Sequence, residues 1–368
     1  MNTSTSQAGR PPSKRRGIVR EVTRRIVRGE WGPGEQIPTQ VELEEMFEAG
    51  NPTVQKALNR LADSGFIVAR RPHGTYVTED PPHTCRYGLV FPNNPYSSWS
   101  RLYGALVSAA GKLERDPERG ALEVPVYYDV DRHMDSEDCR LLMDDLRNWR
   151  LGGVIFAFFP FELAGTPLLS GEGPPCVAVA EAGAWEEYSI PARYPDRRSL
   201  VRKALGHVAS EEGGGRERVA MLTYDASDDF ADFVVGAAAQ RGLESRRAWV
   251  QSPRLKPGAV ERTVELLCGL PAGARPDALI IEDDNYVEDG TRALARIPVR
   301  VPQDLIVVGH CNFPNIPPAS VPVVRIGFRA RDLLLECIGT LRRLRAGEEV
   351  EGVKMMPAVF GGQRRCAQ

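Results

Sequence analysis

Residues 18–77 read IVREVTRRIVRGEWGPGEQIPTQVELEEMFEAGNPTVQKALNRLADSGFIVARRPHGTYV, and this stretch decides the fold of the first part of the chain. Apolar residues recur at the 3.6-residue period of a helix, and Gly or Pro residues separate the segments. The spacing predicts three helices and two short strands, over residues 17–28, 40–48, 52–64, 65–68 and 74–77. Three helices followed by a β-ribbon with a basic turn are typical of a winged helix-turn-helix domain, which we assign to residues 17–78.

The third predicted helix has a polar N-terminal end that suits contact with base edges in a major groove. Pro52 fits its first position, because the missing N–H costs nothing there. Val54, Leu58 and Leu61 face inward, and the outward side chains are Asn51, Thr53, Gln55, Lys56 and Asn59. Asn and Gln amides can pair with adenine, and Lys with guanine or phosphate. The pattern predicts a recognition helix that binds double-stranded DNA.

Further DNA contacts are expected from a flexible basic arm at residues 1–16, from the second helix and from the wing. Eight basic residues and one acid, Glu21, lie between Arg10 and Arg28, although the whole chain has a net charge of −2. Local charge decides here, because salt screens phosphate attraction within about 10 Å at 0.1 M. These candidates are Lys14, Arg15, Arg16, Thr39, Gln40, Arg70, Arg71, His73 and Gly74. Two alternatives stay open: a solvated basic tail, and a winged helix that contacts only proteins.

This first segment resembles the GntR family of bacterial repressors over its whole length. The motifs are Gly29-x-x-x-Pro33-Gly34-x-x-Ile37-Pro38, Thr53-Val54-x-x-Ala57-Leu58-x-x-Leu61, Gly65 and Gly74-Thr75-Tyr76-Val77. The departures lie on the expected DNA-facing surface, at Gly50-Asn51, Gln55 and Pro72-His73. The resemblance implies a winged helix that represses transcription, but because of these departures the family's common operator sequence does not carry over to this chain.

The pattern changes after a polar, proline-rich linker at residues 79–85. Short apolar strands then alternate with helices, which indicates parallel sheets with helical crossovers. The predicted strands are 87–91, 122–127, 153–158, 176–180, 218–222, 248–250, 278–281 and 305–309. The predicted helices are 102–114, 137–149, 198–211, 230–240, 258–268, 289–295 and 331–345. The fold class is therefore α/β, and a region of this size favours two lobes.

Residues 86–368 resemble the sugar-binding core of LacI-type regulators, which shares its fold with periplasmic binding proteins. The matching segments are Tyr87–Pro92 with Asn94-Pro95-Tyr96, Gly152–Ile155, Asp196 with His207, Arg218–Leu222, Pro276–Ile280 with Asp283-Asp284, and Val301–Gly309. The resemblance implies a first lobe at about 86–190 and 323–345, and a second at about 191–322 and 346–368. It also implies an effector ligand, most plausibly a sugar or polyol, in an interlobe cleft.

Ligands of such folds bind at the carboxyl ends of the strands, so the loops there supply the candidates. Polar side chains can bind hydroxyls and aromatic rings can stack on a sugar face. The candidates are Asn94, Tyr96, Ser98, Trp99, Phe159, Asp225, Asp284 and Asn312. Where the family often has an arginine three residues before a helix glycine, this chain has Phe233 before Gly236, which weakens the sugar assignment. The alternative is that these polar residues only form turns and helix caps.

These features together predict a cytoplasmic homodimeric repressor that binds a palindromic operator under the control of a small ligand. Two alternatives remain: a constitutive repressor with a degenerate cleft, and an enzyme with a DNA-binding head. Against the enzyme, the sequence lacks GxGxxG, P-loop, GxSxG and HExxH motifs, and its five histidines are dispersed. No cofactor and no metal are expected. The seven scattered cysteines, and the absence of a membrane span or signal peptide, agree with a reducing compartment.

Overall fold

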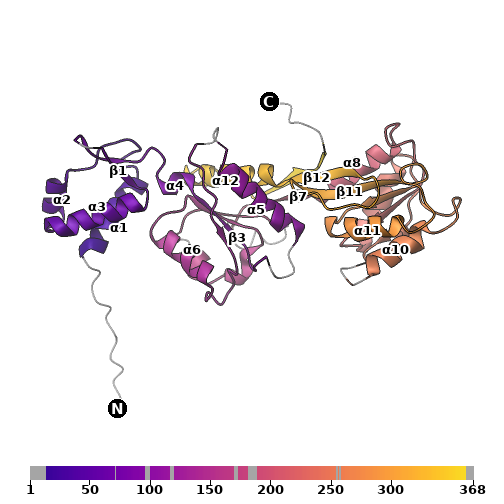
Figure 1. The fold of residues 1–368 in the computed structure, drawn as a ribbon, viewed down its shortest axis with the longest axis horizontal. Coiled ribbons are helices and arrows are strands. Elements are labelled where there is room, and N and C mark those ends of the chain that lie inside the picture. The colour runs from indigo at the N-terminus through magenta and orange to yellow at the C-terminus, as the bar shows by residue number, and fades with distance from the viewer. Residues whose placement is uncertain are drawn as a thin grey trace, which may run out of the picture. The chain divides into compact units, whose positions relative to one another are not determined.

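The computed structural model describes residues 14–70, 72–95, 100–116, 120–169, 173–180, 189–253, 256 and 258–361. Figure 1 shows the chain from the indigo N-terminal helices to the yellow C-terminal strands. The first domain, residues 14–77, is called the head below. It consists of α1 (Lys14–Val27), α2 (Gln40–Met46), α3 (Asn51–Asp63), β1 (Ile67–Arg70) and β2 (Gly74–Val77). The two strands pair antiparallel, with Ile67 opposite Val77, and form the predicted ribbon.

The core of the head confirms the inward residues of the first and third helices. Ile18, Val22, Ile26, Val54, Leu58 and Leu61 are all buried, and Val27, the fourth residue predicted to face inward on the first helix, is partly buried. For the second helix the sequence predicts Val41, Leu43, Met46 and Phe47 on the core face. This prediction is largely wrong, because Val41 is 65% exposed and Met46 is 43% exposed. Only Leu43 of α2 is buried, with Phe47 partly buried beyond the helix end. Residues two apart on a helix point in nearly opposite directions, so Val41 and Leu43 cannot share one core face.

Three boundaries in and next to the head differ from the prediction. The first helix starts at Lys14, so Lys14, Arg15 and Arg16 are helical, whereas the rest of the expected arm lies outside the described residues. The first strand starts at Ile67, because Gly65 has a φ of +78° and still belongs to the turn that follows α3. The expected linker contains a short helix, α4 (Pro82–Cys85), in which Pro82, His83 and Cys85 are buried. Burial of three residues excludes a fully solvated spacer there.

Two six-stranded, mostly parallel sheets follow, which confirms the α/β class. One has the order β14-β12-β11-β10-β8-β9 and the other β13-β7-β6-β5-β3-β4. The strands are β3 (Tyr87–Val90), β4 (Val126–Tyr127), β5 (Gly153–Phe156), β6 (Cys176–Ala178), β7 (Ala192–Asp196), β8 (Val219–Leu222), β9 (Val250–Gln251), β10 (Ala278–Ile281), β11 (Ile306–Phe313), β12 (Val324–Arg329), β13 (Val353–Pro357) and β14 (Val359–Phe360). The β12–β14 pair is antiparallel.

Helices connect these strands close to the predicted positions. They are α5 (Arg101–Leu113), α6 (Glu137–Arg147), α8 (Arg197–Ala209), α9 (Asp228–Ala239), α10 (Ala259–Cys268), α11 (Val287–Leu294) and α12 (Ala330–Arg345). Four strands were not predicted: β7, β12, β13 and β14. In three of them, such as ARYPD and VRIGFR, charged residues, glycine or proline interrupt the apolar run, and β14 has only two residues. A scan for short apolar runs therefore passes over them.

Contacts divide the chain into two compact units. Unit 1 contains residues 1–93, 113–177 and 338–350, and unit 2 contains residues 94–112, 178–337 and 351–368. Unit 2 holds the sheet from β8 to β12 with α8 and α9 packed on one apolar cluster and α10 and α11 on another. The strand β12 lies in the stretch that the sequence assigned to the first lobe, but it pairs with β11 in this sheet.

Candidate DNA-binding surface and ligand pocket

The outward face of α3 carries the predicted recognition residues. Asn51, Gln55, Lys56 and Asn59 are exposed and Thr53 is partly exposed, because the opposite face packs in the core of the head. Gln55 Nε2 donates a hydrogen bond to Asn59 Oδ1 at 2.8 Å. This bond links residues one helical turn apart on the surface, where solvent or a base edge can replace either partner. The face is therefore polar, accessible and already oriented.

The N-terminal candidates and the second helix contribute in different ways. Arg15 and Arg16 are exposed on α1, while Lys14 Nζ donates to the Glu48 carbonyl at 2.9 Å. Thr39 forms a capping box with Glu42, in which its hydroxyl donates to Glu42 Oε2 at 2.8 Å and accepts from the Glu42 N–H at 3.4 Å. The Thr39 hydroxyl thus has a structural role as the N-cap of α2. Gln40 is half-buried and donates to Glu44 Oε1 at 3.2 Å.

The wing is shaped by a residue that the sequence did not single out. Gln36 Nε2 donates to the His73 carbonyl at 3.2 Å, and the Tyr76 hydroxyl donates to the same carbonyl at 3.1 Å. Gly74 has a φ of +117°, and a Cβ there would lie 2.5 Å from Gln36 Nε2. Arg70 lies over the Tyr76 ring at 5.0 Å and pairs with Glu79 at 3.2 Å. His73 is exposed at the turn, and Arg71 lies outside the described residues.

Unit 2 contains a cavity of about 270 Å³ at the carboxyl ends of its parallel strands. We call it the pocket. It is lined by Ser100, Leu102, Val179, Ala180, Tyr194, Pro195, Arg197, Tyr224, Glu282, Asp283, Asp284, Asn285, His310, Asn312 and Phe328. Polar residues from the ends of β10 and β11 form one wall, and the rest combines apolar residues such as Leu102, Val179 and Phe328 with polar ones such as Ser100 and Arg197. This composition is typical of small-molecule sites.

Asp284 and Asn312 are the two predicted ligand residues that the structure brings together in the pocket. Each is only 3% exposed, and Asn312 Nδ2 donates to Asp284 Oδ2 at 2.8 Å. Burial raises the pKa of the Asp284 carboxyl, and the hydrogen bond from Asn312 opposes that rise. Burial likewise raises the pKa of Asp283, whose Oδ1 accepts from the Asn285 N–H at 2.9 Å. Asp283 and Asn285 form a turn, as the alternative of turns and helix caps predicts. The neighbouring Asp284–Asn312 pair is buried, and a turn does not require such a pair.

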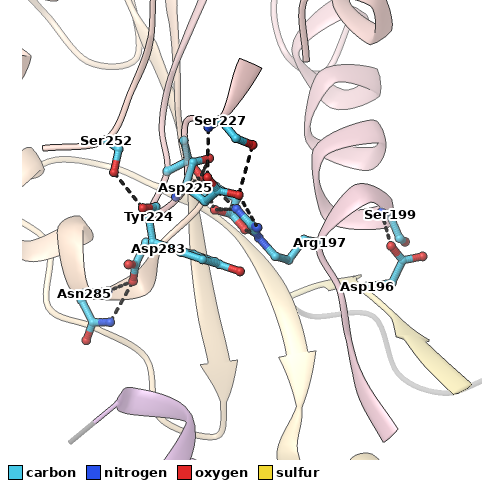
Figure 2. A network of polar contacts seen from close by, with 11 residues as sticks. Asp196, Arg197, Ser199, Tyr224, Asp225, Ser227, Ser252, Asp283 and Asn285 are labelled. Atoms are coloured by element: carbon cyan, nitrogen blue, oxygen red, sulfur yellow. Dashed lines mark hydrogen bonds and ion pairs between the residues drawn. The ribbon is translucent and has the colours of Figure 1, made fainter. Parts of the chain in front are cut away.

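A second polar network beside the pocket was missed at the sequence level. Arg197 donates to both Glu282 carboxylate oxygens, at 2.7 and 3.0 Å, and to Thr223 Oγ1 at 3.0 Å. Its guanidinium also lies over the Tyr224 ring at 3.8 Å. Figure 2 shows Arg197 reaching from the start of α8 toward Tyr224 and Asp225. The one signal in the sequence was the position of Glu282 directly before Asp283-Asp284. Nothing in the sequence links Glu282 to Arg197, which lies 85 positions earlier.

Among the other predicted ligand residues, the described ones, Asn94, Phe159 and Asp225, do not line the pocket. Phe159 belongs to unit 1 and stacks on Phe161 at 6.3 Å. Asp225 accepts from the Ser227 N–H at 3.0 Å, and neither it nor Asn94 is among the lining residues. Tyr96, Ser98 and Trp99 lie outside the described residues. Phe233, where the family often has an arginine, lies under Arg198 and Arg202 at 4.6 and 5.1 Å.

The described residues lack two features that other classes of protein contain. They contain no group of three or more His, Cys, Asp or Glu side chains placed to hold a metal ion. No helix in the described part of the chain is long and apolar enough to cross a membrane.

The head and the two-sheet domain define a class of protein in which a winged helix-turn-helix precedes a binding-protein-like domain. Residues 14–77 match the family model of bacterial regulatory proteins, gntR family, and residues 212–357 match the model of the periplasmic binding protein-like domain. The chain therefore combines a GntR-type helix-turn-helix domain with a periplasmic-binding-protein-like domain. Both predicted resemblances are confirmed at the level of the domains.

Two curated relatives are similar to this chain over short segments. The histidine utilization repressor of Klebsiella aerogenes is 32% identical over 62 residues, covering 17% of this chain and 26% of that protein. The mannosyl-D-glycerate transport/metabolism system repressor of Escherichia coli is 34% identical over 65 residues, covering 18% of this chain and 27% of that protein. The chain thus spans about a quarter of the length of these relatives.

Solved structures are similar over the second domain. A LacI-type transcription regulator from Bifidobacterium animalis superposes with a TM-score of 0.52 at 17% identity, covering 75% of this chain and 97% of that one. A LacI-family protein from Rhizobium etli gives a TM-score of 0.58 at 14% identity, covering 75% and 97%. At these identities the similarity establishes the fold.

Proposed function

We propose that the protein is a transcription repressor that binds a palindromic operator as a homodimer, under the control of a small ligand in the pocket. The observation that carries this proposal is the pairing of two features in one chain. The N-terminal half of α3 is exposed and polar, and unit 2 contains a cavity with a buried Asp284–Asn312 pair. The first feature suits base contacts in a major groove, and the second suits a small molecule.

DNA binding by the head is supported by charge as well as by shape. Arg15 and Arg16 lie on α1, and Lys56 lies on the exposed face of α3. Cationic side chains there would neutralise phosphates while Asn51, Gln55 and Asn59 reach the base edges. A dimer would place two such heads on half-sites about 34 Å apart. Repression is the role that the names of the histidine utilization and mannosyl-D-glycerate system relatives give to those proteins.

The ligand would act by favouring one arrangement of the two-sheet domain over another. A ligand shifts such an equilibrium only by its difference in affinity for the two arrangements. The pocket contains hydrogen-bonding groups and apolar walls, as a sugar or polyol site would. Operator binding, and hence this regulation, would take place in the cytoplasm.

Fluorescence anisotropy with duplexes from the promoter region of the protein's own gene tests the proposal. We expect nanomolar binding to one palindromic segment, and affinity at least about a thousandfold lower for unrelated duplex at the same salt concentration. A binding-competent small molecule should change the operator affinity without changing the nonspecific affinity. Equal affinity for all duplexes, lost at 200 mM salt, would contradict operator recognition. Specific binding that no ligand alters would support the constitutive alternative.

A further inference from the structure

The polar groups of the pocket are divided unequally between hydrogen-bond donors and acceptors. Three consecutive carboxylates, Glu282, Asp283 and Asp284, line it, and Arg197 is the one lining residue with a guanidinium or ammonium group. Arg197 is committed to Glu282, because it donates to both oxygens of that carboxylate. Thr223 Oγ1 also donates to Glu282 Oε2, at 2.8 Å. Glu282 is therefore compensated within the protein.

The other two carboxylates have neutral partners. Asp283 Oδ1 accepts from the backbone N–H and the side-chain amide of Asn285, at 2.9 and 2.8 Å, and Figure 2 shows these two contacts. Asp284 accepts from the Asn312 amide. Within the described part of the chain, neither aspartate forms an ion pair. The nearby Arg101 pairs instead with Glu288, at 3.4 Å. The pocket therefore holds more negative than positive charge, in a place with little access to water.

Asn312 supplies an independent observation that points to a ligand. Its Oδ1 atom is buried and accepts no hydrogen bond from the described residues. The amide cannot turn over to use that oxygen elsewhere, because the rotation would place Oδ1 against the Asp284 carboxylate. Buried acceptors without a donor are rare in native proteins. This oxygen lies next to a carboxylate with no ion-pair partner among the described residues, and together they point to a donor that those residues do not supply.

We propose that the ligand of this pocket carries a protonated amine, which binds between Asp284 and the Asn312 carbonyl oxygen. An ammonium group has three donors and no acceptor, so it can serve both oxygens at once. The rest of the molecule would lie against Leu102, Val179 and Phe328. A cavity of about 270 Å³ holds a small compound such as an amino sugar or a short diamine. This inference rests on the proposed function, because it names the chemical class of the effector.

A neutral sugar fits these groups less well. Its hydroxyls can donate to the same oxygens, but they leave the charges of the buried Asp284 and the partly buried Asp283 uncompensated. A ligand with its own carboxylate would add to the negative charge. The pocket therefore selects for a positive charge as well as for donors.

Matched pairs of compounds test the proposal on the full chain. Calorimetric titration and thermal melts at pH 7.5 would compare glucosamine with glucose and with N-acetylglucosamine, and cadaverine with 1,5-pentanediol. We expect at least one amine to bind at least about tenfold tighter than its uncharged counterpart. Asp284→Asn keeps the shape and should remove that preference. Asp229→Asn removes the same charge from an exposed site on α9 and should retain it.

The outcomes separate this inference from the proposed function. Equal or tighter binding of the neutral members, or no binding of any amine at millimolar concentration, would overturn the amine assignment. A preference that survives in Asp284→Asn would also overturn it, provided that the melting temperature without ligand shows a folded variant. If an amine binds but leaves operator affinity unchanged, the amine site stands and the regulatory proposal fails. If only a neutral compound controls operator binding, the regulatory proposal stands and the amine assignment fails.

Discussion

The head and the pocket use polar side chains in opposite ways. On α3 the polar residues are exposed, and the one bond between them, from Gln55 to Asn59, joins two surface groups. In the pocket Glu282, Asp284 and Asn312 are each 3% exposed and belong to hydrogen-bonded pairs. Exposed polar residues contribute little to folding, whereas removing one member of a buried pair leaves its partner desolvated. Substitutions on α3 can therefore change DNA recognition without changing stability, whereas substitutions of the buried pocket residues change ligand recognition and stability together.

The largest effect on stability is expected for Arg197→Ala. The substitution leaves the Glu282 carboxylate buried without its bidentate partner, which should lower the free energy of unfolding by about 3 kcal/mol. Urea denaturation of the full chain measures the change. The control is Arg247→Ala, because Arg247 pairs with Asp228 and Asp232 at the surface, where less than about 1 kcal/mol is at stake. Similar losses for the two variants would remove the contrast between buried and exposed groups.

The next effect depends on pH and concerns His83, a buried polar side chain in contact with the head. His83 is 5% exposed, and its ring stacks on Phe66 at 5.9 Å. Burial first, and the charge of Arg345 second, lower its pKa from 6.5 to about 4. Between pH 6.5 and pH 4 this histidine is protonated in the unfolded chain but stays neutral in the folded chain. The free energy of unfolding therefore falls as the pH drops from about 6.5 toward 4. The slope from one such group is at most about 1.4 kcal/mol per pH unit.

Melting curves between pH 7 and pH 4 measure this dependence. His83→Phe keeps an aromatic ring beside Phe66 and should have a flatter stability profile over that interval. His73→Phe, at the exposed wing turn, is the matched control and should follow the parent protein. A parent profile as flat as that of His83→Phe would contradict the lowered pKa.

A smaller effect is expected for Gly74→Ala, which tests whether the geometry of the wing matters for the head. The φ of +117° is strained for alanine, and its Cβ would meet Gln36 Nε2 at 2.5 Å. We expect a loss of about 1–2 kcal/mol in stability and weaker operator binding. The double variant Gln36→Ala/Gly74→Ala removes the collision but keeps the strained φ, so it should recover part of the loss. Full recovery would show that the positive φ of alanine costs no stability. No recovery would show that the collision with Gln36 costs none.

The smallest effect on stability is expected for Gln55→Ala. Its side chain is exposed and bonds only to Asn59 among the described residues, so unfolding should change by less than about 0.5 kcal/mol. Operator affinity should nevertheless fall by about 1–3 kcal/mol at one base position. Lys56→Ala should instead weaken binding to all duplexes and reduce its salt dependence. A Gln55→Ala variant that loses stability but keeps its operator affinity would contradict the separation of recognition from stability in the head.

The sequence predicted local features well and long-range ones poorly. The bounds of α3 differ from the prediction by one residue at each end, because Gly50, Pro52 and Gly65 mark them. The wing strand β2 was predicted without error for the same reason. Arg197 and Glu282, in contrast, meet only because β7, β8 and β10 lead to one end of unit 2. No local pattern encodes that meeting. Asp284 and Asn312 were predicted from their places in loops that follow strands, and their contact became evident only in the fold.

One buried arginine has a consequence for how the chain can be cut or extended. Arg193 on β7 is completely buried, donates from Nη1 to the carbonyls of Ala192 and Glu351, and lies 3.4 Å from Glu336. The residue after Glu351 leads directly into β13, which pairs with β7 from Ala192 onward. A truncation at residue 350 would therefore remove an acceptor from a cation that has no water to replace it. The last two strands, which pair with β7 and β12, must therefore stay with any fragment that is meant to fold.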